Sequence, residues 1–331
     1  MWNDRFKGLC CGALAAMAYG MNPLFTLPLY KIGMTPDTVL FYRYFFAMAL
    51  LGILIRWRKG SFQLSAKQIS LVAAGGFLMA LSSLLLFLSY KKMDAGIAST
   101  LLFIYPVMVA VIMAVFFHEK VTVSTILGIL AALTGVCILY KGGDGQPLNF
   151  TGLILVLFSA LSYALYMVAV RETGMKDISP ELLTFYALFF GLPLFLIRMN
   201  FGLELQWIPT LSGWGCAVAL AVLPTIVSLL LMTVAIRVIG ATRTAILGAL
   251  EPATAVCFGV LLFGEQLTLR LVIGIIVILT AVTIVVTGKR ISTRFPRFCK
   301  KTLPRSHPQN TLTGTTRRRM WKSENNQERS E

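Results

Sequence analysis

Residues 240–268 read GATRTAILGALEPATAVCFGVLLFGEQLT, an apolar run that places a carboxylate and a proline side by side near its middle. Residues 94–122 read DAGIASTLLFIYPVMVAVIMAVFFHEKVT and align with it without gaps at an offset of 146 residues. Extending the alignment to 46 positions gives 12 identities, among them the prolines of both runs. Shared apolar composition would not by itself align proline, glutamate, threonine and glycine together. The two halves of the chain are therefore predicted to be repeats of one another.

The composition defines the class of protein. The chain has 331 residues, of which 57% are hydrophobic and only 13% are charged, whereas a soluble chain is about one quarter charged. Too few polar side chains exist to cover a water-facing surface, which predicts an integral membrane protein. The net charge of +16 is concentrated in 289–331, where twelve basic residues accompany three acidic ones. We therefore expect a basic, disordered cytoplasmic tail that contacts anionic lipid, and no nucleic-acid partner.

Ten apolar runs are long enough to cross a bilayer as helices, for which about 20 residues suffice. The predicted spans of this all-α protein are 8–29, 37–56, 70–90, 95–117, 122–140, 150–170, 180–199, 211–236, 241–263 and 268–287. Five spans per repeat is an odd number, so the second half enters the membrane from the opposite side, as an inverted-topology repeat. The repeats are expected at 1–143 and 144–288. Lys and Arg are more frequent in the inner loops when both termini are cytoplasmic.

The two quoted runs, together with VLFYRYFFAMALLGILI at 39–55, resemble the EamA-type repeats of the drug/metabolite transporter superfamily. The resemblance covers roughly residues 8–287. It implies a bacterial inner-membrane permease with ten helices, and such permeases often export amino acids or other small metabolites. It also implies that the first, third, fourth, sixth, eighth and ninth spans line a central cavity.

Glu251 stands near the middle of its span, where an ionised carboxylate facing lipid would cost several kcal/mol. It must face a cavity, find a partner or remain protonated, and a carboxyl group that changes charge suits proton coupling or binding of an ammonium group. The alternative is a structural hydrogen bond beside Pro252. Tyr105 occupies the equivalent position in the first repeat, so both side chains are expected at one cavity. Pro106 and Pro252 are predicted to bend their helices around it.

Arg43 is the other charge well inside a span. It is a candidate to balance Glu251 or to bind a substrate carboxylate. The alternative is a structural role near the outer interface, six residues from Asp37, where it would snorkel or pair. The polar residues expected elsewhere are Arg243 at the cytoplasmic surface and the helix-start residues Glu119, Thr122, Glu265 and Thr268.

Polar side chains inside the apolar spans complete the candidate cavity. The candidates for substrate contact are Tyr19, Tyr105, Tyr163, Tyr166, Ser162, Thr225 and Glu251. Tyr19 and Tyr163 are equivalent in the two repeats at an offset of 144, and aromatic faces suit a cationic or aromatic substrate. Most Ser and Thr side chains in such helices bond their own backbone or a neighbouring helix instead.

The sequence lacks a GxxxxGK[ST] loop, and its histidines and cysteines have no metal-ligand spacing. We therefore expect no cofactor, no metal and no catalytic residue, in a secondary transporter that exports an amino acid or similar metabolite by alternating access. Proton coupling through Glu251 is a secondary hypothesis, and facilitated diffusion is its rival. The alternatives are a broad drug or organic-cation exporter and, in a different class, a non-transporting membrane scaffold or subunit. The expected partners are a small-molecule substrate and the lipid bilayer, and a homodimer is compatible with the sequence.

Overall fold

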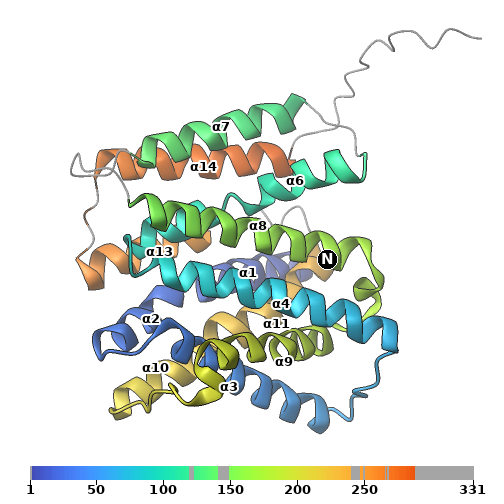
Figure 1. The fold of residues 1–331 in the computed structure, drawn as a ribbon. Helices are drawn as coiled ribbons and strands as arrows, with labels where there is room; N and C mark the ends of the chain where they lie inside the picture. Colours follow the sequence, from blue (N-terminus) through green and yellow to red (C-terminus); the bar gives the residue numbers. More distant parts are fainter. Residues whose placement is uncertain are drawn as a thin grey trace, which may run out of the picture. The chain divides into compact units, whose positions relative to one another are not determined.

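The computed structural model describes residues 2–118, 123–140, 149–239, 247–248, 250–264, 266 and 268–287. Over these residues the protein is built of helices (Figure 1). No strand occurs in that part of the chain. The helices of the first half are α1 (Trp2–Gly20), α2 (Asn22–Lys31), α3 (Pro36–Trp57), α4 (Ala66–Ser89), α5 (Ala95–Leu102), α6 (Tyr105–Phe116) and α7 (Val123–Tyr140). Those of the second half are α8 (Phe150–Glu172), α9 (Pro180–Arg198), α10 (Leu211–Ala221), the π-helix η3 (Val222–Val227), α11 (Ser228–Ile239), α13 (Leu250–Phe263) and α14 (Leu269–Thr287), with short 3-10 turns at Gly174–Asp177 and Asn200–Gly202. The expected tail at 289–331 and the residues Glu119, Thr122, Arg243 and Glu265 lie outside the described residues.

Short polar residues set the starts of the long helices. Ser65 accepts a hydrogen bond from the backbone N–H of Gln68, and the Gln68 side chain reaches back to the Ser65 backbone N–H, which forms a capping box before α4. At the start of α9 the Ser179 side chain accepts a hydrogen bond from the backbone N–H of Leu182, and Pro180 occupies the first helical position. A proline there needs no N–H, because the first turn of a helix has no internal acceptor for one. These loops therefore stop one apolar run and begin the next.

Seven helical stretches in the described residues are long and apolar enough to cross a membrane. They are Phe6–Lys31, Pro36–Trp57, Ala66–Ser89, Ala95–Phe116, Phe150–Val170, Pro180–Arg198 and Leu211–Met232. The other three predicted spans contain the shorter apolar helices Ile126–Gly135, Leu250–Phe263 and Leu269–Ala281. Each of the ten runs thus contains helix, and the count of ten crossings remains a prediction.

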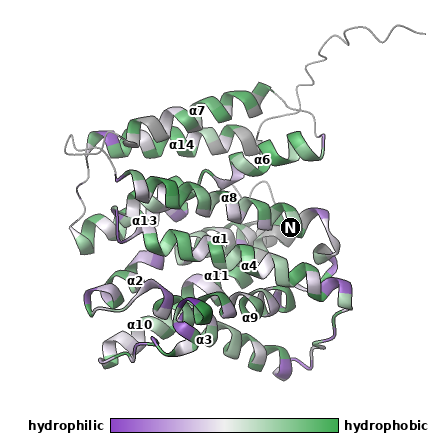
Figure 2. Ribbon diagram, in the orientation of Figure 1, coloured by the Kyte–Doolittle hydropathy of each residue, from purple (hydrophilic) through white to green (hydrophobic). Residues whose placement is uncertain are grey.

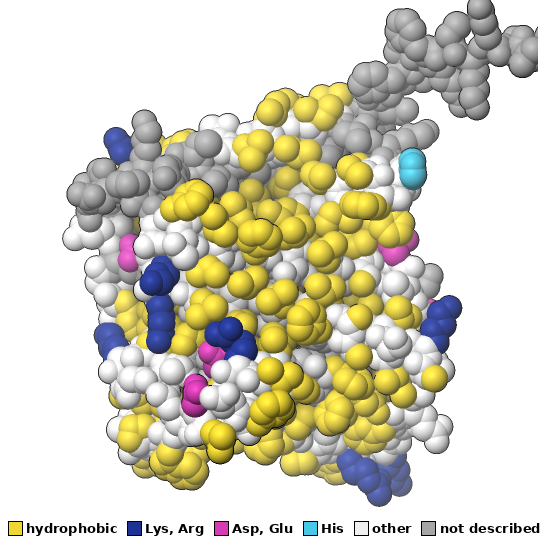
Figure 3. All heavy atoms as spheres, in the orientation of Figure 1, with side chains coloured by type: hydrophobic (Ala, Val, Ile, Leu, Met, Phe, Trp, Pro, Cys, Tyr) yellow, Lys and Arg dark blue, Asp and Glu magenta, His cyan; other side chains and the backbone are white. Residues whose placement is uncertain are grey.

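Apolar side chains cover the outside of the helices. Ile53, Val115 and Leu261 are each more than half exposed, at 66%, 62% and 72%. Figure 2 shows hydrophobic residues along the helices and hydrophilic ones mainly at helix ends and loops, and Figure 3 shows a face dominated by hydrophobic atoms. Exposed apolar surface on this scale suits contact with lipid rather than water.

The closest packing joins helices of the two halves. Residues Met1–Thr293 form one compact unit, in which α1 packs along α11, α4 along α8 and α9, and α7 along α14. A Cβ atom added to Gly76 of α4 would lie only 2.6 Å from the carbonyl oxygen of Ala187 in α9. Small residues therefore let the two backbones approach, as is common between helices in membranes.

Candidate functional site

Two of the predicted spans are each divided into two helices. One predicted span consists of α1 and α2 with Met21 between them, and another consists of α5 and α6 with a turn at Phe103 and Ile104. Pro106 lies in the first turn of α6 and Pro252 in the first turn of α13. Neither proline removes a helical hydrogen bond there, since the N–H groups of a first turn have no acceptor within the helix. Broken helices place backbone groups and side chains at positions that a continuous helix would hide.

Glu251 is buried in α13, with 9% of its surface exposed. Helix α1 approaches α13 closely at this point. A Cβ atom added to Gly20 would lie 2.5 Å from the Glu251 carbonyl oxygen and 2.8 Å from the Cβ atom of Thr254. The glycine at the end of α1 therefore brings Tyr19, its neighbour in the chain, beside the carboxylate-bearing helix.

Four tyrosines from different parts of the chain lie within electrostatic reach of Glu251. Tyr19, Tyr90, Tyr105 and Tyr163 each interact electrostatically with its carboxyl group. The rings of Tyr105 and Tyr163 meet edge to face with centroids 4.7 Å apart. Aromatic pairs favour this geometry, and phenol groups at a buried site require polar partners. Tyr105 and Tyr163 thus bring α6 and α8 to the same place.

Two further predicted residues continue this aromatic face along α8. The rings of Tyr163 and Tyr166 stack with their centroids 6.1 Å apart. Ser162, which precedes Tyr163 in the chain, is buried. Other hydroxyls bond between helices, as expected of most such groups: Ser159 donates to the carbonyl oxygen of Ser82 at 2.7 Å. That pair has a structural role in joining α8 to α4.

Arg43 is buried inside the protein. It is 4% exposed, its Nε donates to the Thr225 hydroxyl at 3.0 Å, and its guanidinium lies 5.5 Å from the centre of the Phe87 ring. Arg43 also interacts with the Tyr19 phenol. Asp37, near which we considered an interfacial role for Arg43, pairs instead with Arg198 at 2.6 Å. Arg43 therefore has a buried partner in the π-helix η3 and is not the partner of Asp37.

These residues form one group, which we call the central polar cluster. Its members are Tyr19, Arg43, Tyr105, Tyr163, Thr225 and Glu251, contributed by α1, α3, α6, α8, η3 and α13. Sequence reasoning named all six but missed Tyr44 and Tyr90, which lie at its edge. Tyr44 shares a hydrogen bond of 2.9 Å with Ser83. Its place next to Arg43 in the sequence could have indicated that it lies near the cluster. No group of three His, Cys, Asp or Glu side chains suited to a metal occurs among the described residues.

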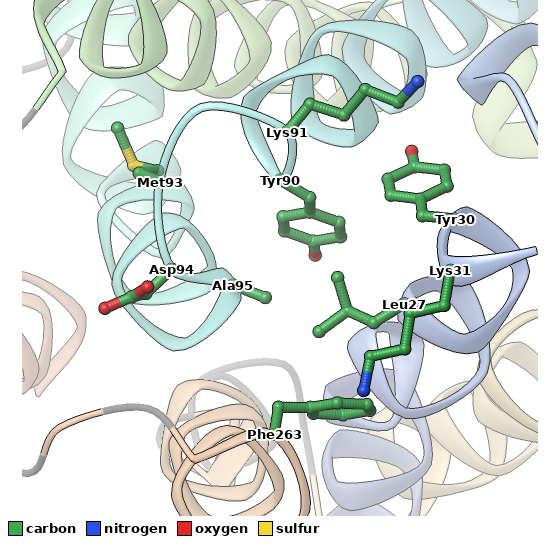
Figure 4. A pocket seen from close by; sticks show the side chains of 9 residues that line it. All are labelled: Leu27, Tyr30, Lys31, Tyr90, Lys91, Met93, Asp94, Ala95 and Phe263. Carbon is green, nitrogen blue, oxygen red and sulfur yellow. The ribbon is translucent and has the colours of Figure 1, made fainter. Parts of the chain in front are cut away.

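A pocket of about 510 Å³ opens between the ends of four predicted spans (Figure 4). Its lining includes Tyr30 and Lys31 at the end of α2, Tyr90 and Lys91 after α4, and Phe263 at the end of α13. We call it the lysine pocket. Tyr90 connects it to the central polar cluster, because the Tyr90 phenol also interacts electrostatically with Arg43 and Glu251.

Known proteins share both sequence and fold with this chain. An uncharacterized transporter of Archaeoglobus fulgidus is 33% identical over 198 residues, which cover 59% of this chain and 68% of the archaeal protein. The uncharacterized transporter YcbK of Bacillus subtilis is 27% identical over 254 residues, or 74% of this chain and 81% of YcbK. One crystal structure has the same fold, with a TM-score of 0.61 at 18% identity over 84% of this chain and 95% of that one. Residues 6–141 and 150–287 match the EamA-like transporter family, and the chain is therefore a multi-pass membrane protein that belongs to this family.

Proposed function

We propose that this protein is a secondary transporter that exports a small metabolite, an amino acid or a similar compound, by alternating access. The central polar cluster carries the proposal. Six polar side chains from six helical elements meet inside a protein with an apolar outer surface, in a member of a transporter family. Polar and ionisable groups at such depth are costly, and in membrane proteins they mark substrate and ion pathways.

The packing of the helices supports an inverted repeat. The predicted alignment makes α1 equivalent to α8, α4 to the α10–α11 span, and α5 with α6 to α13. The contact of α1 with α11 then corresponds to that of α8 with α4, and both are present. Spans that are equivalent in the two repeats also contact one another: α5 contacts α13, and α7 contacts α14. Two such halves moving around a shared site would give access from each side in turn.

The orientation proposed here, in a bacterial inner membrane with both termini cytoplasmic, rests on the excess of Lys and Arg in the inner loops, and contacts between span ends support the assignment of those ends to one side. Lys31 and Lys91 follow two different spans and line one pocket, as expected if both ends lie on the same side of the membrane. Arg198 at the end of α9 and Asp37 at the start of α3 are assigned to the same side and form an ion pair. Side chains assigned to the outer surface thus contact one another.

Glu251 is the proposed coupling residue. It is buried, and the Tyr19 phenol interacts with both Glu251 and Arg43, so the charge state of Glu251 affects the rest of the cluster. A carboxyl group that binds a proton on one side and releases it on the other would couple export to the proton gradient. The same carboxylate among aromatic rings also suits an organic cation, which makes a broad drug or cation exporter the second candidate. A scaffold without transport would leave the cluster without a role.

The first test compares metabolites released by cells that express wild type, Glu251→Gln, Glu204→Gln or an empty vector. Glu204 is an exposed loop acid that bonds Asn200, so its substitution controls for the loss of a carboxylate elsewhere. We expect one compound to accumulate outside wild-type and Glu204→Gln cells and to return to the vector level with Glu251→Gln at equal protein levels. Release that is unchanged in Glu251→Gln would leave export standing and make Glu251 structural. No difference between wild type and vector would count against export and move the test to uptake by liposomes.

A further inference from the structure

The loop that joins α9 to α10 presents large apolar side chains to its surroundings. Phe201, Leu203 and Trp207 lie in this loop, and Leu211 is the first residue of α10. Each of these side chains is between 76% and 89% exposed. Apolar groups gathered in this way on a surface mark a site of contact with another protein or with a membrane.

Polar groups of the same loop are bonded to the protein. The Gln206 side chain accepts a hydrogen bond from the backbone N–H of Thr35 at 2.7 Å and donates one to the carbonyl oxygen of Gly33 at 3.3 Å. The backbone carbonyl oxygen of Gln206 accepts a third from the Tyr42 hydroxyl at 3.1 Å. The loop is therefore fastened to the turn between α2 and α3 through polar groups, and its apolar side chains remain on the outside.

The turn that carries Phe201 has a backbone conformation that phenylalanine disfavours. The φ angles of Asn200, Phe201 and Gly202 are 50°, 56° and 93°. Glycine and asparagine adopt such left-handed conformations readily, whereas a bulky side chain rarely does. The Asn200 side chain donates a hydrogen bond to the Glu204 carboxylate at 2.8 Å, which holds the turn. The fold thus keeps an unfavourable conformation at Phe201, and its ring, which is 83% exposed, gains little packing within the described part of the chain.

The apolar surface of the loop continues that of the two spans that it joins. Ile197 in the last turn of α9 is 58% exposed, and Val218 in α10 is 43% exposed. In a multi-pass membrane protein such surfaces contact lipid. The ring centroid of Trp207 lies 4.9 Å from that of Trp214 in α10, and tryptophan side chains gather at the boundary between headgroups and acyl chains. Continuity with the lipid-facing spans favours the bilayer, rather than a second protein, as the partner of the loop.

We propose that the α9–α10 loop lies in the headgroup and upper acyl region of the bilayer, with the exposed apolar side chains of 201–211 in contact with lipid. Because Gln206 fastens the loop to the turn between α2 and α3, this anchor sets the ends of α2 and α3 at the same membrane depth as those of α9 and α10. The inference depends on the membrane and not on transport, so it is independent of the proposed function.

Fluorescence quenching of Trp207 tests where the loop lies. The full-length protein is placed in phosphatidylcholine nanodiscs, whose two faces are both open to solution, after phenylalanine replaces the other tryptophans, Trp2, Trp57, Trp214 and Trp321. We expect lipid brominated near the headgroup end of its acyl chains to remove most of the Trp207 fluorescence. Lipid brominated near the terminal methyl groups should remove less, and aqueous iodide should remove little.

A tryptophan in another loop provides the control. Gln63 is exposed in the loop between α3 and α4, so Gln63→Trp, with Trp207 also replaced by phenylalanine, should be quenched by iodide more than by brominated lipid. Quenching of Trp207 by iodide and not by brominated lipid would overturn the proposal, because it would place the α9–α10 loop in water. Quenching of Trp207 by neither agent would also overturn it, because a protein surface such as a second copy of the chain would then cover the loop.

Substitutions at Phe201 test whether the apolar side chains hold the loop in lipid. Phe201→Asn removes the ring and suits the left-handed backbone, so the variant should melt no lower than its parent. We expect Trp207 in this variant to lose part of its quenching by brominated lipid and to gain quenching by iodide. Phe201→Tyr keeps an amphipathic ring and should behave as the parent does. Unchanged quenching in a folded Phe201→Asn protein would overturn the anchoring role of the ring.

Discussion

Gly20 sets the distance between α1 and α13 at the level of Glu251. A methyl group at this position would overlap the Glu251 carbonyl oxygen, which is backbone and cannot rotate away. We predict that Gly20→Ala destabilises the protein by about 1–3 kcal/mol, the usual cost of overpacking, and lowers transport. Thermal unfolding in detergent, followed by transport in liposomes, measures both effects.

Gly215→Ala provides the control for that substitution. Gly215 lies in α10, and an added Cβ atom would meet nothing within 4 Å. Alanine there should leave the stability unchanged or raise it slightly, because alanine has less conformational freedom than glycine in the unfolded chain and a higher helix propensity. Similar losses in both variants would mean that helix flexibility, and not the contact with α13, is what matters at Gly20.

The Thr225 hydroxyl is the hydrogen-bond acceptor for the Arg43 Nε. Thr225→Val keeps the shape of the side chain and removes the acceptor, so a buried cation loses a partner. We expect a loss of about 1–3 kcal/mol in unfolding free energy. Thr134→Val is the comparison, since Thr134 is exposed and donates only to Leu130 in its own helix. If both variants unfold alike in a denaturant series, the Arg43 contact contributes no more than a surface bond.

Single residues were predictable where their chemistry conflicts with their surroundings. Glu251 and Tyr105 stood out as polar groups in apolar runs at equivalent positions of a repeat, and the structure brings both to the central polar cluster. The partner of Arg43 was not predictable, because Thr225 is 182 residues away in the chain and nothing local joins them. Tyr90 was missed because it ends a span, where tyrosine is common for interfacial reasons. Whether any of these residues touches a substrate stays a prediction.

The break between α5 and α6 belongs to the scale of the element. Pro106 lies just after the turn at Phe103 and Ile104, and alanine there would allow the two helices to join with one more backbone hydrogen bond. We predict that Pro106→Ala folds with little change in stability but transports several times more slowly. Pro180→Ala, at the capped start of α9, should transport normally. Equal rates for both variants and wild type would show that the break has no part in transport.

Element boundaries followed from the sequence more reliably than element interiors. The span predicted at 37–56 is α3 (Pro36–Trp57), since Thr35 and the proline mark its start. The break at Met21 and the π-helix at Val222–Val227 were not predicted. Both occur within apolar runs, where hydropathy is uniform and does not register a change in hydrogen-bond pattern. Such irregular turns are fixed by tertiary contacts, as where η3 meets α1 and α3.

The orientation of the whole molecule can be tested by labelling. In a variant whose six native cysteines are replaced, Lys31→Cys, Lys91→Cys and Lys67→Cys each introduce one exposed thiol. A maleimide that cannot cross membranes should label positions 31 and 91 on intact cells and position 67 only after the membrane is opened. The reverse pattern would invert the proposed topology and place the lysine pocket on the cytoplasmic side.

The bond between Arg43 and Thr225 has a consequence for how the protein is made. At a synthesis rate of about 5–20 residues per second, the 182 residues that separate these two positions take roughly 10 to 40 s to emerge from the ribosome. Ser82 likewise cannot form its hydrogen bond with Ser159 until 77 further residues have been synthesised. During that interval the early helices hold a guanidinium and a hydroxyl without their final partners. Until the second half of the chain is inserted, the insertion machinery or lipid headgroups must therefore supply temporary polar partners for these side chains of the first half.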